Sequence, residues 1–287
     1  MSVPALGFGT AAILGRVSRR RGVEALERAY AAGVRHFDTA RSYGWGSAEG
    51  VVGAFLQQYP RNEIRLVTKC GILPVRQSPL LDFAKSVARA AVAVAPGLRA
   101  HARRIASADA FQPTYTYDLD ALSGSLRTSL EQLGLGYIDD FLLHNFQAGK
   151  PGVEDVVEWF KGLQRSGVIR RYGFSLHDDL LTGLDFLARR DLLADATIQV
   201  PVSEALFDLP GEWRDVRLVA HSPFSFLARQ AASGGKFRTL HDLLLGLSDA
   251  CRCESLVCSM YAPEHLAANV AAWRACVGGK DSLRRIR

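Results

Sequence analysis

The sequence lacks long hydrophobic runs: none of its 287 residues lies in a stretch that approaches the roughly 20 apolar residues of a bilayer-spanning helix. Residues 1–15 are apolar, but they have no basic segment before them and are interrupted by Pro4, Gly7 and Gly9, which argues against a secretory signal peptide. Low-complexity tracts and nucleic-acid-binding motifs are also missing. We therefore expect a cytoplasmic protein with no membrane and no nucleic-acid partner.

Cysteine is scarce, and its number, five, is odd. An odd number in a chain of this length predicts reduced thiols in a reducing compartment rather than a disulfide framework. Cys251, Cys253 and Cys258 lie close together with His241 and His265 on either side, but they lack the paired spacing of a zinc site. We interpret them as buried structural cysteines and expect no metal.

The composition is that of a globular protein, with 48% hydrophobic and 22% charged residues and a net charge of +6. Strand-like and helix-like segments alternate along it. The predicted strands are residues 5–10, 35–39, 65–70, 140–144, 172–175, 196–201, 216–221 and 256–260. The predicted helices lie between Ser18 and Gly33 and at residues 48–57, 119–133, 153–163, 180–190, 240–247 and 263–273.

Eight strands that alternate with helices along the chain predict an α/β fold of the (β/α)8 TIM-barrel type, forming one domain over residues 1–287. An open doubly wound sheet is the alternative, but the chain has no Gly-x-Gly-x-x-Gly turn between a strand and a helix. Residues 71–117, between the third strand and the third helix, are too long for a βα loop. We expect helices at 84–94 and 98–106 in this insertion, which would lie over the active-site face.

Four polar residues fall at or just beyond the C-terminal ends of three consecutive predicted strands: Asp38, Tyr43, Lys69 and His144. In a barrel these positions open on the same rim, where active sites lie. Each residue alone is more often structural, but together they can reduce a carbonyl. Tyrosine can give a proton to the developing alkoxide, although its ordinary pKa is about 10. We expect Lys69 to lower the pKa of Tyr43, Asp38 to hold Lys69, and His144 to orient the carbonyl oxygen.

The chain resembles the aldo-keto reductase superfamily nearly from end to end, and most closely its bacterial branch that handles free aldoses. The resemblance rests on residues 7–11 (GFGTA), 33–53 (GVRHFDTARSYGWGSAEGVVG), 67–71 (VTKCG), 117–145 (YDLDALSGSLRTSLEQLGLGYIDDFLLHN) and 259–270 (SMYAPEHLAANV). It implies an NAD(P)(H)-dependent oxidoreductase acting on a carbonyl or sugar-like substrate. It also implies that Asp38, Tyr43, Lys69 and His144 are the catalytic residues, with Tyr43 as the general acid.

The resemblance further implies a set of nucleotide-binding residues, with departures from the family pattern. Leu176 replaces an amide-binding Asn, His221 replaces a stacking Tyr, and Ser259 and His265 fall where the family has cations for the 2′-phosphate. NADP(H) is favoured, and NAD(H) stays possible. The residues implied are Gly9, Thr10, Ala11, Asp38, Ser175, Gln199, His221, Ser222, Pro223, His265 and Asn269. Tyr43, His144 and Trp45 are expected to form the substrate pocket.

Two other functions stay open at this point. The departures at Leu176, His221 and Ser259 fit a barrel that binds a nucleotide to regulate a partner without turnover. A biosynthetic lyase or isomerase on the same barrel is the other, with Lys69 forming a Schiff base. The sequence does not fix an oligomeric state.

Overall fold

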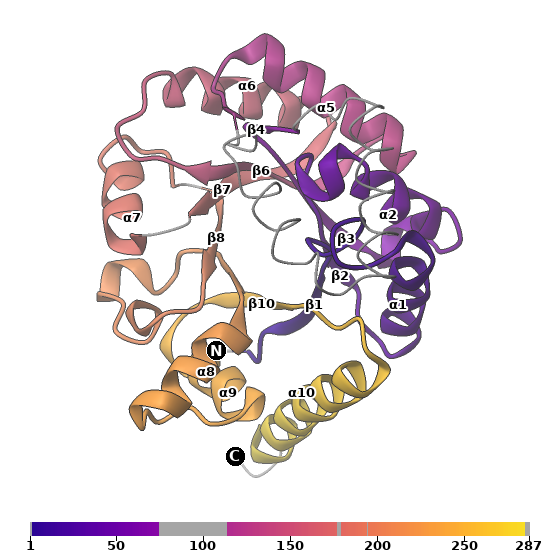
Figure 1. Cartoon of the computed structure of the whole chain (residues 1–287). Helices are drawn as coiled ribbons and strands as arrows, with labels where there is room; N and C mark the ends of the chain where they lie inside the picture. The colour runs from indigo at the N-terminus through magenta and orange to yellow at the C-terminus, as the bar shows by residue number, and fades with distance from the viewer. Residues whose placement is uncertain (1, 75–113, 177–178, 194, 285–287) are drawn as a thin grey trace, which may run out of the picture.

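The chain folds into a closed barrel of parallel strands surrounded by helices (Figure 1). The computed structural model describes residues 2–74, 114–176, 179–193 and 195–284, and it describes side chains as far as residue 278. The order around the barrel is β1-β10-β9-β8-β7-β6-β3-β2, and every neighbouring pair is parallel. The strands are β1 (Ala5–Gly9), β2 (His36–Asp38), β3 (Arg65–Cys70), β6 (Ile138–Phe146), β7 (Ile169–Leu176), β8 (Thr197–Pro201), β9 (Leu218–His221) and β10 (Cys253–Cys258). The predicted (β/α)8 barrel is confirmed.

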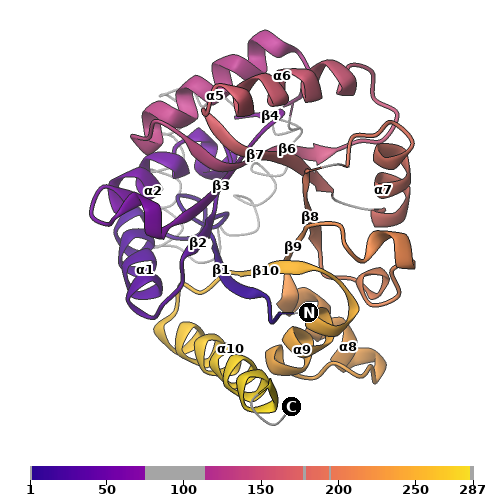
Figure 2. The same ribbon diagram turned by 180° about the vertical axis from the view of Figure 1, so that it is seen from behind.

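The helices form an outer ring around the strands (Figures 1 and 2). They are α1 (Arg19–Ala31), α2 (Ala48–Leu56), α5 (Leu119–Leu133), α6 (Val153–Arg165), α7 (Leu180–Ala188), α8 (Pro223–Ser233), α9 (Leu240–Ala250) and α10 (Pro263–Arg284). In α5, Asp118 accepts a hydrogen bond from the Ala121 amide at the first turn, and Gly134 ends the helix in the left-handed conformation. Its buried face carries Leu122, Leu126 and Leu133, which pack on the barrel.

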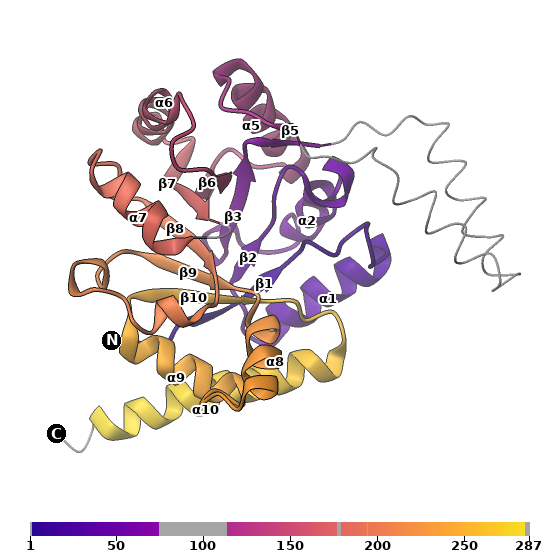
Figure 3. The same ribbon diagram turned by 60° about the vertical axis from the view of Figure 1, so that its left-hand side comes forward.

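The C-terminal part of the ring departs from the prediction. No α-helix follows β8, where the sequence predicts none; the connection to β9 holds two 3-10 turns, Glu204–Leu206 and Gly211–Trp213, and Pro210 and Gly211 interrupt the segment. Two helices, α8 and α9, follow β9, and α8 is absent from the prediction. Figure 3 shows α9 and α10 together on the side of the barrel that β10 and β1 form.

The ends of the predicted insertion form a small sheet of their own. Strands β4 (Ile72–Leu73) and β5 (Thr114–Tyr115) pair in an antiparallel arrangement beyond the end of β3. The helices expected at 84–94 and 98–106 lie outside the described residues. That the insertion covers the active-site face stays a prediction.

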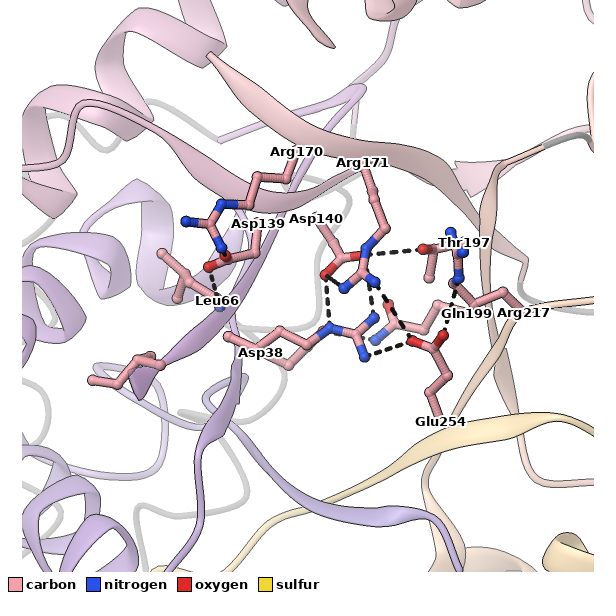
Figure 4. A network of polar contacts seen from close by, with 12 residues as sticks. Asp38, Leu66, Asp139, Asp140, Arg170, Arg171, Thr197, Gln199, Arg217 and Glu254 are labelled. Carbon is pink, nitrogen blue, oxygen red and sulfur yellow. Dashed lines mark hydrogen bonds and ion pairs between the residues drawn. The ribbon is translucent and has the colours of Figure 1, made fainter. Parts of the chain in front are cut away.

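The starts of the strands carry a network of ion pairs around the buried carboxylate of Asp140 (Figure 4). Asp140 on β6 has no exposed surface and accepts two hydrogen bonds each from Arg65 of β3 and Arg171 of β7, at 2.7 to 3.2 Å. Glu254 on β10 accepts from Arg65 at 2.7 Å and lies 2.9 Å from Arg217. Four strands and the segment before β9 are thereby joined at the floor of the barrel, the face that in TIM barrels serves stability.

The network determines the charge state of its central carboxylate. Burial alone would raise the pKa of Asp140, but the guanidinium groups of Arg65 and Arg171 outweigh it and hold the pKa at about 2. Asp140 is therefore ionised above about pH 4, and its charge is shared by both arginines.

We predict that Asp140→Asn lowers the free energy of unfolding by about 3 kcal/mol, because it removes a buried charge that Arg65 and Arg171 share. Among the described residues, it leaves these partly exposed arginines only Glu254 as a counter-charge. Urea denaturation at pH 7 measures the change. Asp185→Asn serves as the control, because it removes an exposed partner of Arg189 on α7 and should cost less than about 1 kcal/mol. Equal effects of the two variants would contradict this account of the floor.

The same variant should change the acid dependence of stability. The pKa of Asp140 is lower in the folded than in the unfolded chain, so its contribution is present above about pH 4 and is lost as the pH falls towards 2. The Asp140→Asn variant should therefore lose less stability than wild type over that interval. An unchanged acid limb would show that Asp140 carries no such linkage.

Candidate active site

The opposite end of the barrel, where the strands end, holds a cavity of about 480 Å³. Residues within or just after β1, β2, β6, β7, β8, β9 and β10 contribute to its wall. The lining residues are Ala11, Arg16, Asp38, Tyr43, His144, Asn145, Ser175, Leu176, Gln199, His221, Ser222, Pro223, Phe224, Ser225, Val257, Cys258 and Ser259. This is the face on which the active sites of TIM barrels lie.

A buried ion pair lies beneath the cavity. Lys69, which is 2% exposed, has its Nζ 2.7 and 2.9 Å from the two carboxylate oxygens of Asp38, and it donates a third hydrogen bond to the Thr39 carbonyl at 2.8 Å. Asp38 also accepts from the amide of Gln199 at 2.6 Å. Strands β2 and β3 pair side by side, so the fold itself brings these two side chains together. Both charges are compensated, as burial requires.

Tyr43 lies directly above this pair. Its ring centroid is 5.2 Å from Lys69 Nζ and 5.7 Å from the ring of His144, which it meets edge to face. The turn that carries Tyr43 continues through Gly44 and Trp45, both in the left-handed region with φ of 55° and 58°. A side chain on Gly44 would come within 2.7 Å of the Ile13 carbonyl, so this turn needs glycine there. The four residues predicted from the strand ends are thus brought together.

The pKa of Tyr43 differs from the prediction. Burial raises it above the ordinary value of 10, the charge of Lys69 acts to lower it, and the carboxylate of Asp38 raises it again. Lys69 therefore acts in the expected direction, but it does not outweigh burial. The pKa of Lys69 itself is raised, because the attraction of Asp38 outweighs burial, which alone would lower it. The site accordingly contains a neutral phenol beside a permanent ammonium.

The structure separates the other predicted residues into two groups. Ala11, Ser175, Gln199, His221, Ser222 and Pro223 line the cavity. Gly9, Thr10, Trp45, His265 and Asn269 are not among its lining residues. Thr10 is buried and donates to the Asp38 carbonyl, Gly9 accepts from Tyr261, and the Trp45 side chain is 46% exposed. The contact of Trp45 with substrate stays a prediction.

Sequence reasoning missed Arg16, Asn145, Phe224, Ser225, Val257 and Cys258 as lining residues. Phe224 and Ser225 lie in the first turn of α8, the helix that hydrophobic periodicity did not indicate. Val257 and Cys258 end β10, and their place at a strand end was the signal available in the sequence. Arg16 lies in the loop after β1, whose backbone turns around the Ala12 carbonyl through hydrogen bonds from Gly15, Arg16 and Val17.

Among the described residues, no helix is long and apolar enough to cross a membrane. Within the same residues, no group of three or more His, Cys, Asp or Glu side chains is arranged to hold a metal ion. All five cysteines are buried free thiols.

Comparison with known sequences gives one family. The model of the Aldo/keto reductase family matches residues 5–181, more than half of the chain. D-threo-aldose 1-dehydrogenase of a Pseudomonas species is 33% identical over 153 residues, which are 50% of this chain and 41% of that protein. NADH-specific methylglyoxal reductase of Escherichia coli is 24% identical over 177 residues, 58% of this chain and 47% of that protein. The matched region spans less than half the length of these curated relatives.

Solved structures extend the likeness of fold to almost the whole chain. An aldo/keto reductase from Klebsiella pneumoniae in complex with NADP and acetate superposes with a TM-score of 0.63 at 22% identity, covering 94% of this chain and 86% of that one. Glycerol dehydrogenase from Gluconobacter oxydans gives a TM-score of 0.63 at 17% identity, over 98% and 91% of the two chains. Identities this low support the fold and nothing finer.

Proposed function

Because the chain belongs to the aldo/keto reductase family, we propose that it is an oxidoreductase that moves a hydride between a nicotinamide nucleotide and a carbonyl or aldose-type substrate. The observation that carries the proposal is the meeting of Tyr43, His144 and the buried Asp38–Lys69 pair at one cavity. A barrel that only binds nucleotide has no need of a buried lysine beneath a tyrosine. We therefore rank the regulatory alternative second, and the Schiff-base alternative third, because Lys69 is held as an ammonium and an ammonium is no nucleophile.

The roles of the four residues follow from their positions. Tyr43 is the proton donor: its raised pKa keeps the phenol protonated near neutral pH, so the proton is available to a carbonyl oxygen that becomes an alkoxide. Lys69 stabilises the phenolate left behind, and Asp38 keeps Lys69 charged and in place. His144, at the edge of the Tyr43 ring, orients the carbonyl oxygen. For oxidation of an alcohol the same groups move the proton in the opposite direction.

The cavity fits a nicotinamide nucleotide, which when bound supplies or accepts the hydride. Ser175, Gln199 and His221 are available to the nicotinamide end. Ser222 to Ser225 bring the N-terminus of α8 to the wall, and the unpaired amides of a helix N-terminus favour phosphate. The Nδ2 of Asn269 is buried with no hydrogen-bond partner among the described residues, as expected of a group that serves a ligand. We propose that Asn269 contacts the adenine.

NADP(H) is our preferred cofactor, with NAD(H) as the alternative. The family's cations at Ser259 and His265 are missing, but Arg16 lies at the cavity and is the one Lys or Arg among its described lining residues. A guanidinium there offers the planar fork that recognises phosphate. The names of the relatives support both cofactors, since one reductase is called NADH-specific and one solved structure contains NADP.

A small polar carbonyl compound is the proposed substrate, and the first of the curated relatives above is named for an aldose. Asn145, Ser175 and His144 offer hydrogen-bonding groups near Tyr43, so the wall suits hydroxylated molecules better than apolar ones. The cytoplasm remains the proposed location, which agrees with five free thiols.

We predict that Tyr43→Phe lowers kcat for carbonyl reduction by about 10²–10⁴-fold, because the variant keeps the ring but has no proton to give. Steady-state assays with NADPH and a small aldehyde measure the loss. The affinity for NADPH should stay within a few-fold of wild type, as checked by fluorescence titration. A variant that keeps most of its kcat would rule out Tyr43 as the general acid.

We also predict that the protein binds NADPH about tenfold more tightly than NADH, a difference of roughly 1.4 kcal/mol in binding free energy. Quenching of the fluorescence of its four tryptophans measures both dissociation constants. Arg16→Ala should abolish the difference, whereas Arg20→Ala, on the exposed start of α1, should leave it intact.

Failure of both nucleotides to bind folded protein would contradict the proposed function. Equal binding of the two by wild type, with no effect of Arg16→Ala, would instead point to NAD(H) as the cofactor.

A further inference from the structure

Asn145, the residue after His144, has an unusual backbone at the wall of the cavity. Its φ of 56° lies in the left-handed region, which few residues other than glycine occupy. Asparagine is among the side chains that tolerate this region best. A residue other than glycine in this region costs free energy, so the surrounding structure must hold Asn145 in this conformation at the wall of the candidate active site.

The strain belongs to a β-bulge near the end of β6. The pairing of β6 with β7 matches His144 to Ser175 and then Phe146 to Leu176, so Asn145 is an extra residue in the ladder. Regular alternation from His144, which faces the cavity, would turn position 145 outwards and position 146 inwards. The extra residue shifts the alternation by one position, so that the side chain at position 145 points inwards and the side chain at position 146 points outwards.

The consequence is seen in both side chains. Phe146 is 7% exposed and packs between Phe174 and Phe186 of the outer layer, with ring centroids 5.1 and 5.7 Å away. Asn145 takes the inward place and lines the cavity together with His144 and Ser175. The bulge therefore removes a phenyl ring from the site and supplies a carboxamide beside the group that orients the carbonyl.

The carboxamide is available to a ligand. Among the described residues, no hydrogen bond to the Asn145 side chain is found, and the side chain is only partly buried. An amide offers two donors and an acceptor, which matches a hydroxyl group that both gives and accepts a hydrogen bond. His144 and Asn145 are neighbours in the chain and line the same cavity, so a molecule whose carbonyl is held at His144 has its next carbon atoms on the side of the cavity where Asn145 lies.

We propose that Asn145 recognises a hydroxyl group on the carbon next to the reacting carbonyl, so that the site selects 2-hydroxyaldehydes, the chemical class that includes the aldoses. The inference rests on the proposed function, because it needs the carbonyl to lie between Tyr43 and His144. Asn145 would act on specificity and not on proton transfer. A site built to hydrogen-bond a hydroxyl discriminates strongly against the analogue that lacks it.

The test compares two aldehydes of equal chain length, glyceraldehyde and propanal, with NADPH as the reductant. The measured quantity is the ratio of kcat/KM for glyceraldehyde to kcat/KM for propanal. Asn145→Gly removes the amide while glycine keeps the left-handed backbone, and Asn145→Asp keeps the shape but has no N–H donor. Asn62→Gly, at the opposite end of the barrel, is the matched control.

Wild type and Asn62→Gly should show the same ratio, in favour of glyceraldehyde, and Asn145→Gly should lower it by at least about tenfold. Asn145→Asp should also lower it, which would assign the effect to the amide donors and not to the backbone. An unchanged ratio in both Asn145 variants, with both aldehydes still reduced, would overturn this inference and leave the proposed function standing. Reduction of neither aldehyde by wild type would overturn both.

Discussion

The ion pair between Lys69 and Asp38 is the interaction on which the candidate site depends. A lysine that is 2% exposed can keep its charge only beside a counter-charge, and here one carboxylate and one carbonyl accept three hydrogen bonds from it. The pair joins adjacent strands at their ends, which fixes the ammonium beneath Tyr43. Without Asp38 the lysine would lose its proton or leave the interior, and the phenolate of Tyr43 would have nothing to stabilise it.

The same strands carry polar or charged groups at both of their ends. Position 65 on β3 belongs to the floor and position 69 to the site, and on β6 the corresponding residues are Asp140 and His144. Residues an even number of positions apart on a strand share a face, so all four face the interior of the barrel. The floor network fixes the starts of the strands, and the ends are then placed accurately enough for a tyrosine and a histidine to meet edge to face.

Most of the barrel and the four polar residues at its rim could be predicted from the sequence. Parallel strands buried on both faces give short apolar runs, and in a barrel the residues that follow them open on one rim. The helix α8 was missed because its buried face is small, with Pro223, Phe226 and Gln230. The direction of the pKa shift of Tyr43 was wrong, because it depends on how much water burial removes, which sequence spacing does not report. The bulge at Asn145 leaves no mark in the hydrophobic pattern, since only pairing with β7 reveals the extra residue.

Direct transfer of hydride to the carbonyl carbon is the step that separates an oxidoreductase from a binding protein or a lyase on the same barrel. It can be followed with two samples of NADPH that carry deuterium on one or the other face of the C4 atom of the nicotinamide ring, each incubated with the protein and glyceraldehyde. We predict that one sample yields an alcohol with a single deuterium on the former carbonyl carbon, and that the other yields none. Product without deuterium from either sample, or no product at all, would contradict the proposed function.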